Sequence, residues 1–121
     1  MAIYYKIEYL KDDNQPEDIS VFIHMKYNVP IYQSKIDKED YDVLPDDLKH
    51  PFLTGLFAIG GIVEVSCRAY RIWISRSPVF SWEETLGPIF NYLLFWYDED
   101  TLIELQGSGI TLGEVNERRD R

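Results

Sequence analysis

Two stretches near the start of the chain alternate apolar and polar residues and are predicted to be β-strands. They cover residues 3–10 and 19–26. A period of two places successive side chains on opposite faces, so each strand has one apolar face. The apolar face of the second strand consists of Ile19, Val21, Ile23 and Met25. Because the polar loop 11–18 between them is short, the two strands are expected to form an antiparallel hairpin.

The middle of the chain changes from a helical period to a second hairpin. A helix is predicted from Pro51, since proline suits a first helical turn, to the stop at Gly60-Gly61. Residues 62–67 and 70–74 then alternate again around a short turn. Their inward residues are expected to be Val63, Val65, Cys67, Tyr70, Ile72 and Ile74.

A second helix is predicted from a capping box at Ser81, with Glu84 three residues later. Its apolar positions continue to Tyr97, and Pro88 within it predicts a kink or a start delayed toward Gly87. Residues 28–49 are interpreted as an acidic surface connection with a short helical turn. Residues 102–105 are open to three interpretations: a strand, a hairpin or an ordered tail.

The predicted element order is ββ-α-ββ-α, which indicates an α+β fold in a single domain over residues 1–113. Two hairpins form one antiparallel sheet, and the two helices cover one of its faces as a two-layer sandwich. Residues 114–121 are expected to be a disordered tail. The core is expected to include Leu56, Phe57, Ile72, Ile74, Ile89 and Leu93.

Residues 50–62 (HPFLTGLFAIGGI), 71–76 (RIWISR) and 82–84 (WEE) carry a family resemblance. The region from residue 50 to residue 96, which contains these three segments, resembles the N-terminal domain of Nfu-type (NifU-like) iron–sulfur scaffold proteins. The resemblance implies the same ββ-α-ββ-α fold. Cluster-handling members of that family carry a separate Cys-x-x-Cys domain that this sequence lacks. The resemblance therefore implies an accessory module and supplies no catalytic or ligand residue.

Charge and cysteine content argue against several classes of function. The chain has 12 basic and 21 acidic residues among 121, for a net charge of −9. Phosphate backbones repel such a surface, so nucleic-acid binding is not expected. No signal peptide and no apolar run of about 20 residues is visible, so we expect a cytoplasmic protein without membrane contact. The lone Cys67 is interpreted as a core residue, with a reactive thiol or an inter-subunit cluster ligand as alternatives.

No motif for catalysis, cofactor binding or metal binding is found. The two histidines, His24 and His50, lack metal-ligand spacing, and Gly60-Gly61 ends a helix whereas phosphate loops open one. Acidic pairs such as Asp46-Asp47 lie in loops or where helices are expected to start, and the helix dipole stabilises carboxylates at a helix start. The chain is therefore not expected to be an enzyme or to hold a cofactor.

The outward residues of the strands form one candidate partner surface. It consists of Tyr4, Lys6, Phe22, His24, Lys26, Arg68, Arg71 and Trp73. With the neighbouring Glu8 and Glu64 this face carries +2, so the rest of the chain carries −11. Aromatic and arginine side chains typically anchor interfaces. The alternative is that these aromatic residues only pair across strands at a wet surface.

The leading hypothesis is a non-catalytic module that binds a protein partner of unknown identity. The alternatives are a homo-oligomer, such as a homodimer in which a second copy presents residues 37–47, and a small-ligand-binding protein.

Overall fold

The computed structural model describes residues 2–10 and 19–105. Six strands form one sheet: β1 (Ala2–Leu10), β2 (Ser20–Met25), β3 (Gln33–Asp37), β4 (Ile62–Arg68), β5 (Arg71–Arg76) and β6 (Thr101–Glu104). The helical elements are α1 (Lys38–Asp42), the short 3-10 helix η1 (Asp46–Leu48), α2 (Pro51–Phe57) and α3 (Trp82–Tyr97). None of these helices is long and apolar enough to cross a membrane.

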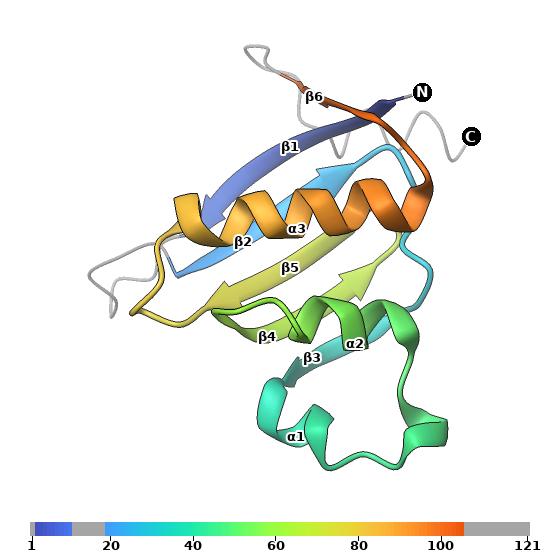
Figure 1. Cartoon of the computed structure of the whole chain (residues 1–121), viewed down its shortest axis with the longest axis vertical. Helices are drawn as coiled ribbons and strands as arrows, with labels where there is room; N and C mark the ends of the chain where they lie inside the picture. Colours follow the sequence, from blue (N-terminus) through green and yellow to red (C-terminus); the bar gives the residue numbers. More distant parts are fainter. Residues whose placement is uncertain (1, 11–18, 106–121) are drawn as a thin grey trace.

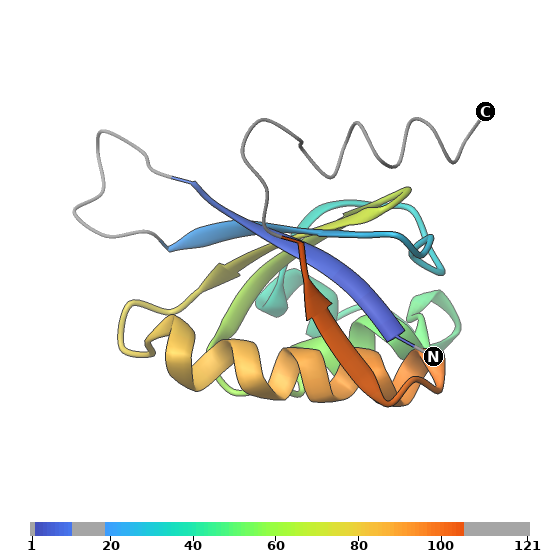
Figure 2. The ribbon, with the colours of Figure 1, turned by 90° about the horizontal axis from the view of Figure 1, so that it is seen from above.

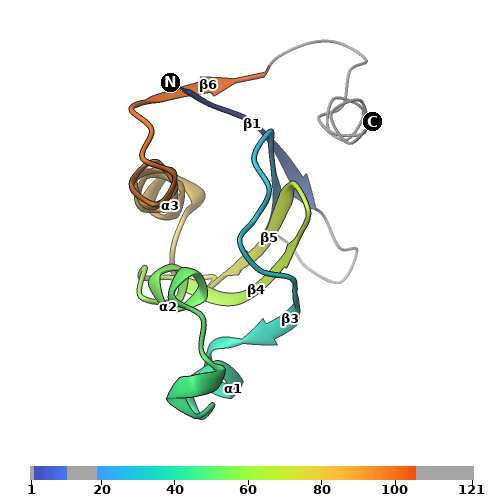
Figure 3. The ribbon, with the colours of Figure 1, turned by 90° about the vertical axis from the view of Figure 1, so that its right-hand side faces the viewer.

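The sheet and the two main helices form two layers, as the α+β prediction required. The strand order is β3-β4-β5-β2-β1-β6 (Figure 1). Both α2 and α3 lie against one face of the sheet, and among residues 2–10 and 19–105 no helix lies against the opposite face (Figures 2 and 3). We call this second face the helix-free face.

One strand pair departs from the predicted antiparallel sheet. The two hairpins are antiparallel and join through β2 and β5, but β6 pairs with β1 in parallel. Because α3 carries the chain back across the sheet, β6 enters beside the start of β1, where Thr101 pairs with Ala2. Residues 102–105 are thus mostly an edge strand, one of the three interpretations left open.

The core lies between the sheet and the helices and contains all six residues predicted for it: Leu56, Phe57, Ile72, Ile74, Ile89 and Leu93. The prediction for Val63 is wrong, because this side chain is 38% exposed while Ile62 is buried. A register shift between Ile62 and Glu64 places an extra residue in β4. Such a bulge reverses the alternation on one side of it, and from Val65 onward the predicted phase holds. Tyr70 lies in the turn after Ala69, so β5 begins only at Arg71.

The acidic stretch 28–49 is more than a surface connection. It contains the edge strand β3 as well as α1 and η1. Sequence pattern missed β3 because it carries one apolar residue, the half-buried Ile36, and its pairing with β4 is irregular. Tyr41 of α1 is buried, and its hydroxyl donates a hydrogen bond to the carbonyl of His50 at 3.1 Å. This contact ties the stretch to the start of α2.

Local capping signals determine where α2 and α3 begin. His50 is the N-cap of α2, where its Nδ1 accepts a hydrogen bond from Phe52 N at 3.1 Å. The capping box of α3 is complete: Glu84 N donates to Ser81 Oγ at 3.1 Å, and Ser81 N donates to Glu84 Oε1 at 3.2 Å. The delayed start expected from Pro88 is wrong, because α3 begins at Trp82 and includes the proline. The loop 11–18 and the predicted tail 114–121 lie outside the described residues.

Candidate functional site

Strand register arranges the outward side chains of the helix-free face in rows across the sheet. Lys6 pairs with His24, His24 with Arg71, and Arg71 with Arg68. Four basic residues from four neighbouring strands therefore form one line, which we call the basic row. The next row along the strands consists of Glu8, Phe22, Trp73 and Ser66.

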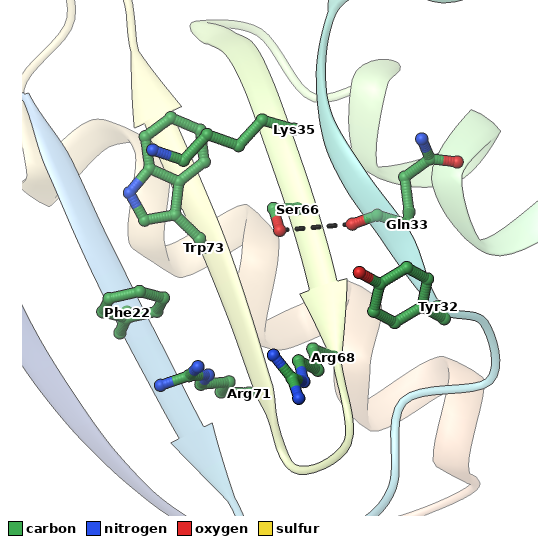
Figure 4. Close-up of a pocket in the computed structure, with 8 residues that line it drawn as sticks. All are labelled: Phe22, Tyr32, Gln33, Lys35, Ser66, Arg68, Arg71 and Trp73. Carbon is green, nitrogen blue, oxygen red and sulfur yellow. Dashed lines mark hydrogen bonds between the residues drawn. The ribbon is translucent and has the colours of Figure 1, made fainter.

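A shallow pocket of about 170 Å³ lies where the second half of the basic row meets β3. We call it the basic pocket, and its lining residues are Phe22, Tyr32, Gln33, Lys35, Ser66, Arg68, Arg71 and Trp73. Figure 4 shows Arg68 and Arg71 at one end of this hollow and Lys35 above Trp73 at the other. The Ser66 hydroxyl donates a hydrogen bond to the Gln33 carbonyl at 3.2 Å, which joins the β3 wall to the sheet. The lining includes three cationic groups and no carboxylate.

The cations of this pocket contact aromatic rings instead of carboxylates. Lys35 Nζ lies 4.4 Å from the centre of the Trp73 ring, and the Arg71 guanidinium carbon lies 4.9 Å from that of Phe22. Within residues 2–10 and 19–105, none of Lys35, Arg68 and Arg71 forms an ion pair. The Arg68 side chain makes no hydrogen bond or ring contact there either. An anion entering the pocket would therefore meet three uncompensated charges.

Trp73 differs from the exposed anchor residue that the sequence suggested. It points to the helix-free face but is only 7% exposed, with the Lys35 ammonium over its ring. The β3 strand that carries Lys35 was not predicted, so the sequence alone left Trp73 uncovered. Trp73 is consequently the floor of the pocket, and the accessible groups are the cations and Tyr32, which is 68% exposed.

The remaining predicted surface residues lie outside the basic pocket, on β1, on β2 and just after β2. Tyr4 and Lys26 form a cation–aromatic pair, with 4.8 Å from Lys26 Nζ to the ring centre, and line a separate hollow near β6. His24 Nε2 lies 3.0 Å from Glu8 Oε1, so this imidazole faces a carboxylate at the middle of the basic row. Of the eight predicted residues, four line the basic pocket: Phe22, Arg68, Arg71 and Trp73.

Sequence reasoning missed three pocket residues, Tyr32, Gln33 and Lys35, and did not include Ser66 in the candidate partner surface. The missed residues lie at or in β3, inside the stretch interpreted as a connection. Their aromatic and basic character matched that of the surface already chosen. No periodic signal placed them next to it, because β3 reaches β4 from more than 25 positions away in sequence.

Cys67 is fully buried on the helix side of β4, as its interpretation as a core residue required. Burial raises the pKa of its thiol to about 12. At neutral pH the group is therefore a neutral thiol and a poor nucleophile or metal ligand.

Comparisons with known proteins support the fold. No family model matches the sequence, and no curated protein sequence matches it significantly. Among solved structures, a NifU-like protein from Saccharomyces cerevisiae is similar over 80% of this chain and 82% of that one, with a TM-score of 0.54 and 12% identity. A Staphylococcus aureus protein is similar over 73% of this chain and 98% of its own, with a TM-score of 0.48 and 14% identity. The chain therefore has an Nfu-like fold, as the resemblance of residues 50–96 implied.

Proposed function

We propose that this chain is a non-catalytic module that binds an acidic segment of a protein partner on its helix-free face. The observation that carries the proposal is the basic pocket, whose three cations lack counter-ions among the described residues of a chain with a net charge of −9. Charge complementarity of this kind steers a partner to one face and suppresses contacts elsewhere.

The composition of the pocket supports binding over catalysis. Its lining contains no carboxylate, imidazole or thiol, and its serine hydroxyl, that of Ser66, donates to the Gln33 carbonyl at 3.2 Å, so this hydroxyl has no histidine or carboxylate base beside it in the pocket. Its aromatic and arginine residues are instead those that carry binding energy at protein interfaces. The negative charge on the remainder of the chain favours a protein partner over a nucleic acid, since a long polyanion would meet repulsion beyond the pocket.

A second copy of this chain is the other candidate partner, because its acidic segment has complementary charge. The segment runs through α1 and η1, and its exposed carboxylates are Asp37, Glu39, Asp40, Asp42, Asp46 and Asp47. A copy that placed this segment on the basic pocket would form a homo-oligomer without any other protein.

Photo-crosslinking from the two faces tests the proposal. A benzophenone amino acid replaces Tyr32 on the helix-free face or Phe95 on α3, which are 68% and 79% exposed. We expect the benzophenone at position 32 to form a discrete covalent adduct between this chain and its partner. The adduct should be lost in the Arg68→Glu/Arg71→Glu variant. The benzophenone at position 95 should form no adduct. An adduct with twice the mass of the chain would identify the second copy. Adducts from position 95 alone would contradict the proposal.

A further inference from the structure

Two arginines face each other across the β4–β5 hairpin, and neither pairs with a carboxylate of the described residues. Arg68 and Arg71 are register partners, and both side chains are exposed on the helix-free face. Like charges directly opposite each other on a sheet destabilise it. Arg71 contacts the Phe22 ring, but no contact among the described residues accounts for Arg68 or offsets the repulsion between the two arginines. The pair has a clear use if an anion binds against both guanidinium groups.

The carboxylates on the same face of the sheet form no ion pair with either arginine in the described residues. Glu8 and Glu64 lie on the same face as the arginines. Glu8 is two positions from Lys6 along β1, and Glu64 is two positions from Ser66 along β4. Glu8 contacts His24 at 3.0 Å, and in the described part of the chain Glu64 forms no ion pair. The arginine pair thus remains available on a face that carries acidic residues of its own.

The number and kind of donors distinguish between anions. A carboxylate would neutralise one of the three cations, whereas a phosphate monoester carries a charge of about −1.5 to −2 at neutral pH and has three acceptor oxygens. Guanidinium groups match phosphate oxygens with two parallel hydrogen bonds each. Lys35 and the Tyr32 hydroxyl, from the opposite wall of the same hollow, offer further donors (Figure 4).

We propose that the basic pocket binds a phosphate monoester on a side chain of the partner protein, with Arg68 and Arg71 as its main ligands. This inference rests on the proposed function and names the group that the partner presents. The pocket is only partly enclosed, which suits a group carried on a polypeptide, and clusters of arginine are a recurring means of recognising phosphorylated segments. The aromatic floor of Phe22 and Trp73 would contact the residues beside the phosphate.

NMR titration with small probes at constant ionic strength tests the inference. The probes are phosphoserine and glutamate, each blocked by N-acetyl and C-amide groups, and inorganic phosphate. We expect blocked phosphoserine to shift the Arg68 and Arg71 signals and to bind at least ten-fold more tightly than blocked glutamate. It should also bind more tightly than inorganic phosphate, because only the blocked residue supplies the backbone that contacts the pocket floor.

Arg68→Gln and Arg71→Gln provide the variants, and Lys38→Gln on α1 is the control with the same change in charge. Each arginine variant should lose the phosphoserine shifts. The melting temperature of Arg68→Gln should equal or exceed that of the wild type, whereas Arg71→Gln also loses its contact with the Phe22 ring and should melt slightly lower. The control should keep the phosphoserine shifts and the melting temperature of the wild type. Equal binding of phosphoserine and glutamate that still depends on the arginines would overturn this inference and leave the proposed function standing. Tighter binding of inorganic phosphate would overturn the polypeptide source, and binding that survives both variants would overturn the site.

Discussion

The thiol of Cys67 illustrates how burial sets the chemistry of one residue. No part of its surface is accessible, and burial raises its pKa to about 12, from about 8.5 for a free thiol. The neutral form is therefore favoured in the folded chain. In the unfolded chain the thiol ionises once the pH exceeds its ordinary value.

This difference predicts a fall in stability at alkaline pH. Because the folded state holds the thiol proton and the unfolded state releases it above pH ~8.5, the free energy of unfolding decreases as the pH rises from there toward 12. The loss amounts to about 1.4 kcal/mol at pH 9.5. Urea unfolding at pH 7.5 and 9.5 measures it, with Cys67→Ala as the control that lacks this contribution. An equal pH dependence in both proteins would show that Cys67 is not buried as described.

At the scale of elements, the contact between α2 and α3 depends on the absence of a side chain at Gly55. A Cβ atom there would lie 2.3 Å from the Tyr92 ring, far inside van der Waals distance. The one proton of the Tyr92 hydroxyl is shared between the carbonyls of Phe52 at 3.0 Å and Pro51 at 3.2 Å. Tyr92 thus packs over the glycine and satisfies carbonyl groups of the neighbouring helix.

Gly55→Ala is therefore expected to destabilise the fold by about 1–3 kcal/mol, because the new methyl group displaces the Tyr92 ring. In an isolated helix the same change would stabilise by about 1 kcal/mol. In the Tyr92→Ala background, where the obstruction is gone, Gly55→Ala should accordingly increase stability. Urea unfolding of the wild type, the two single variants and the double variant measures whether Gly55→Ala lowers or raises the free energy of unfolding in each background. A single Gly55→Ala variant as stable as the wild type would contradict the packing described between the two helices.

The helices and strands differ in how far they could be predicted from the sequence. The start of α3 was predictable because its capping box is a local signal at Ser81 and Glu84. The strands with regular alternation were predictable as well. Val63 was not, since a bulge is set by the pairing of two strands and leaves no mark in the alternation of one. β3 was not, because an exposed edge strand with a single half-buried apolar residue has no period to detect.

At the scale of the whole molecule, charge is distributed unevenly between surfaces. The acidic residues of α1 and η1 follow β3 in the chain, and α1 lies beside β3 at the edge of the sheet (Figure 3). The basic pocket lies on the helix-free face, between β3 and β2. Half of the pocket was predictable from strand phase alone, through Phe22, Arg68, Arg71 and Trp73. The other half depends on β3 pairing with β4, a long-range contact that brings Lys35 over Trp73.

The helix-free face is expected to receive an anionic partner through the basic pocket. NMR titration of the isotope-labelled protein with a blocked hexaglutamate peptide, at low and at high salt, measures this binding. We predict saturable shifts at the amides of residues 33–35 and 66–73, which weaken at high salt because the attraction is electrostatic. The amides of α3 should stay unchanged. Shifts confined to the helix layer, or spread evenly over both faces, would contradict this expectation.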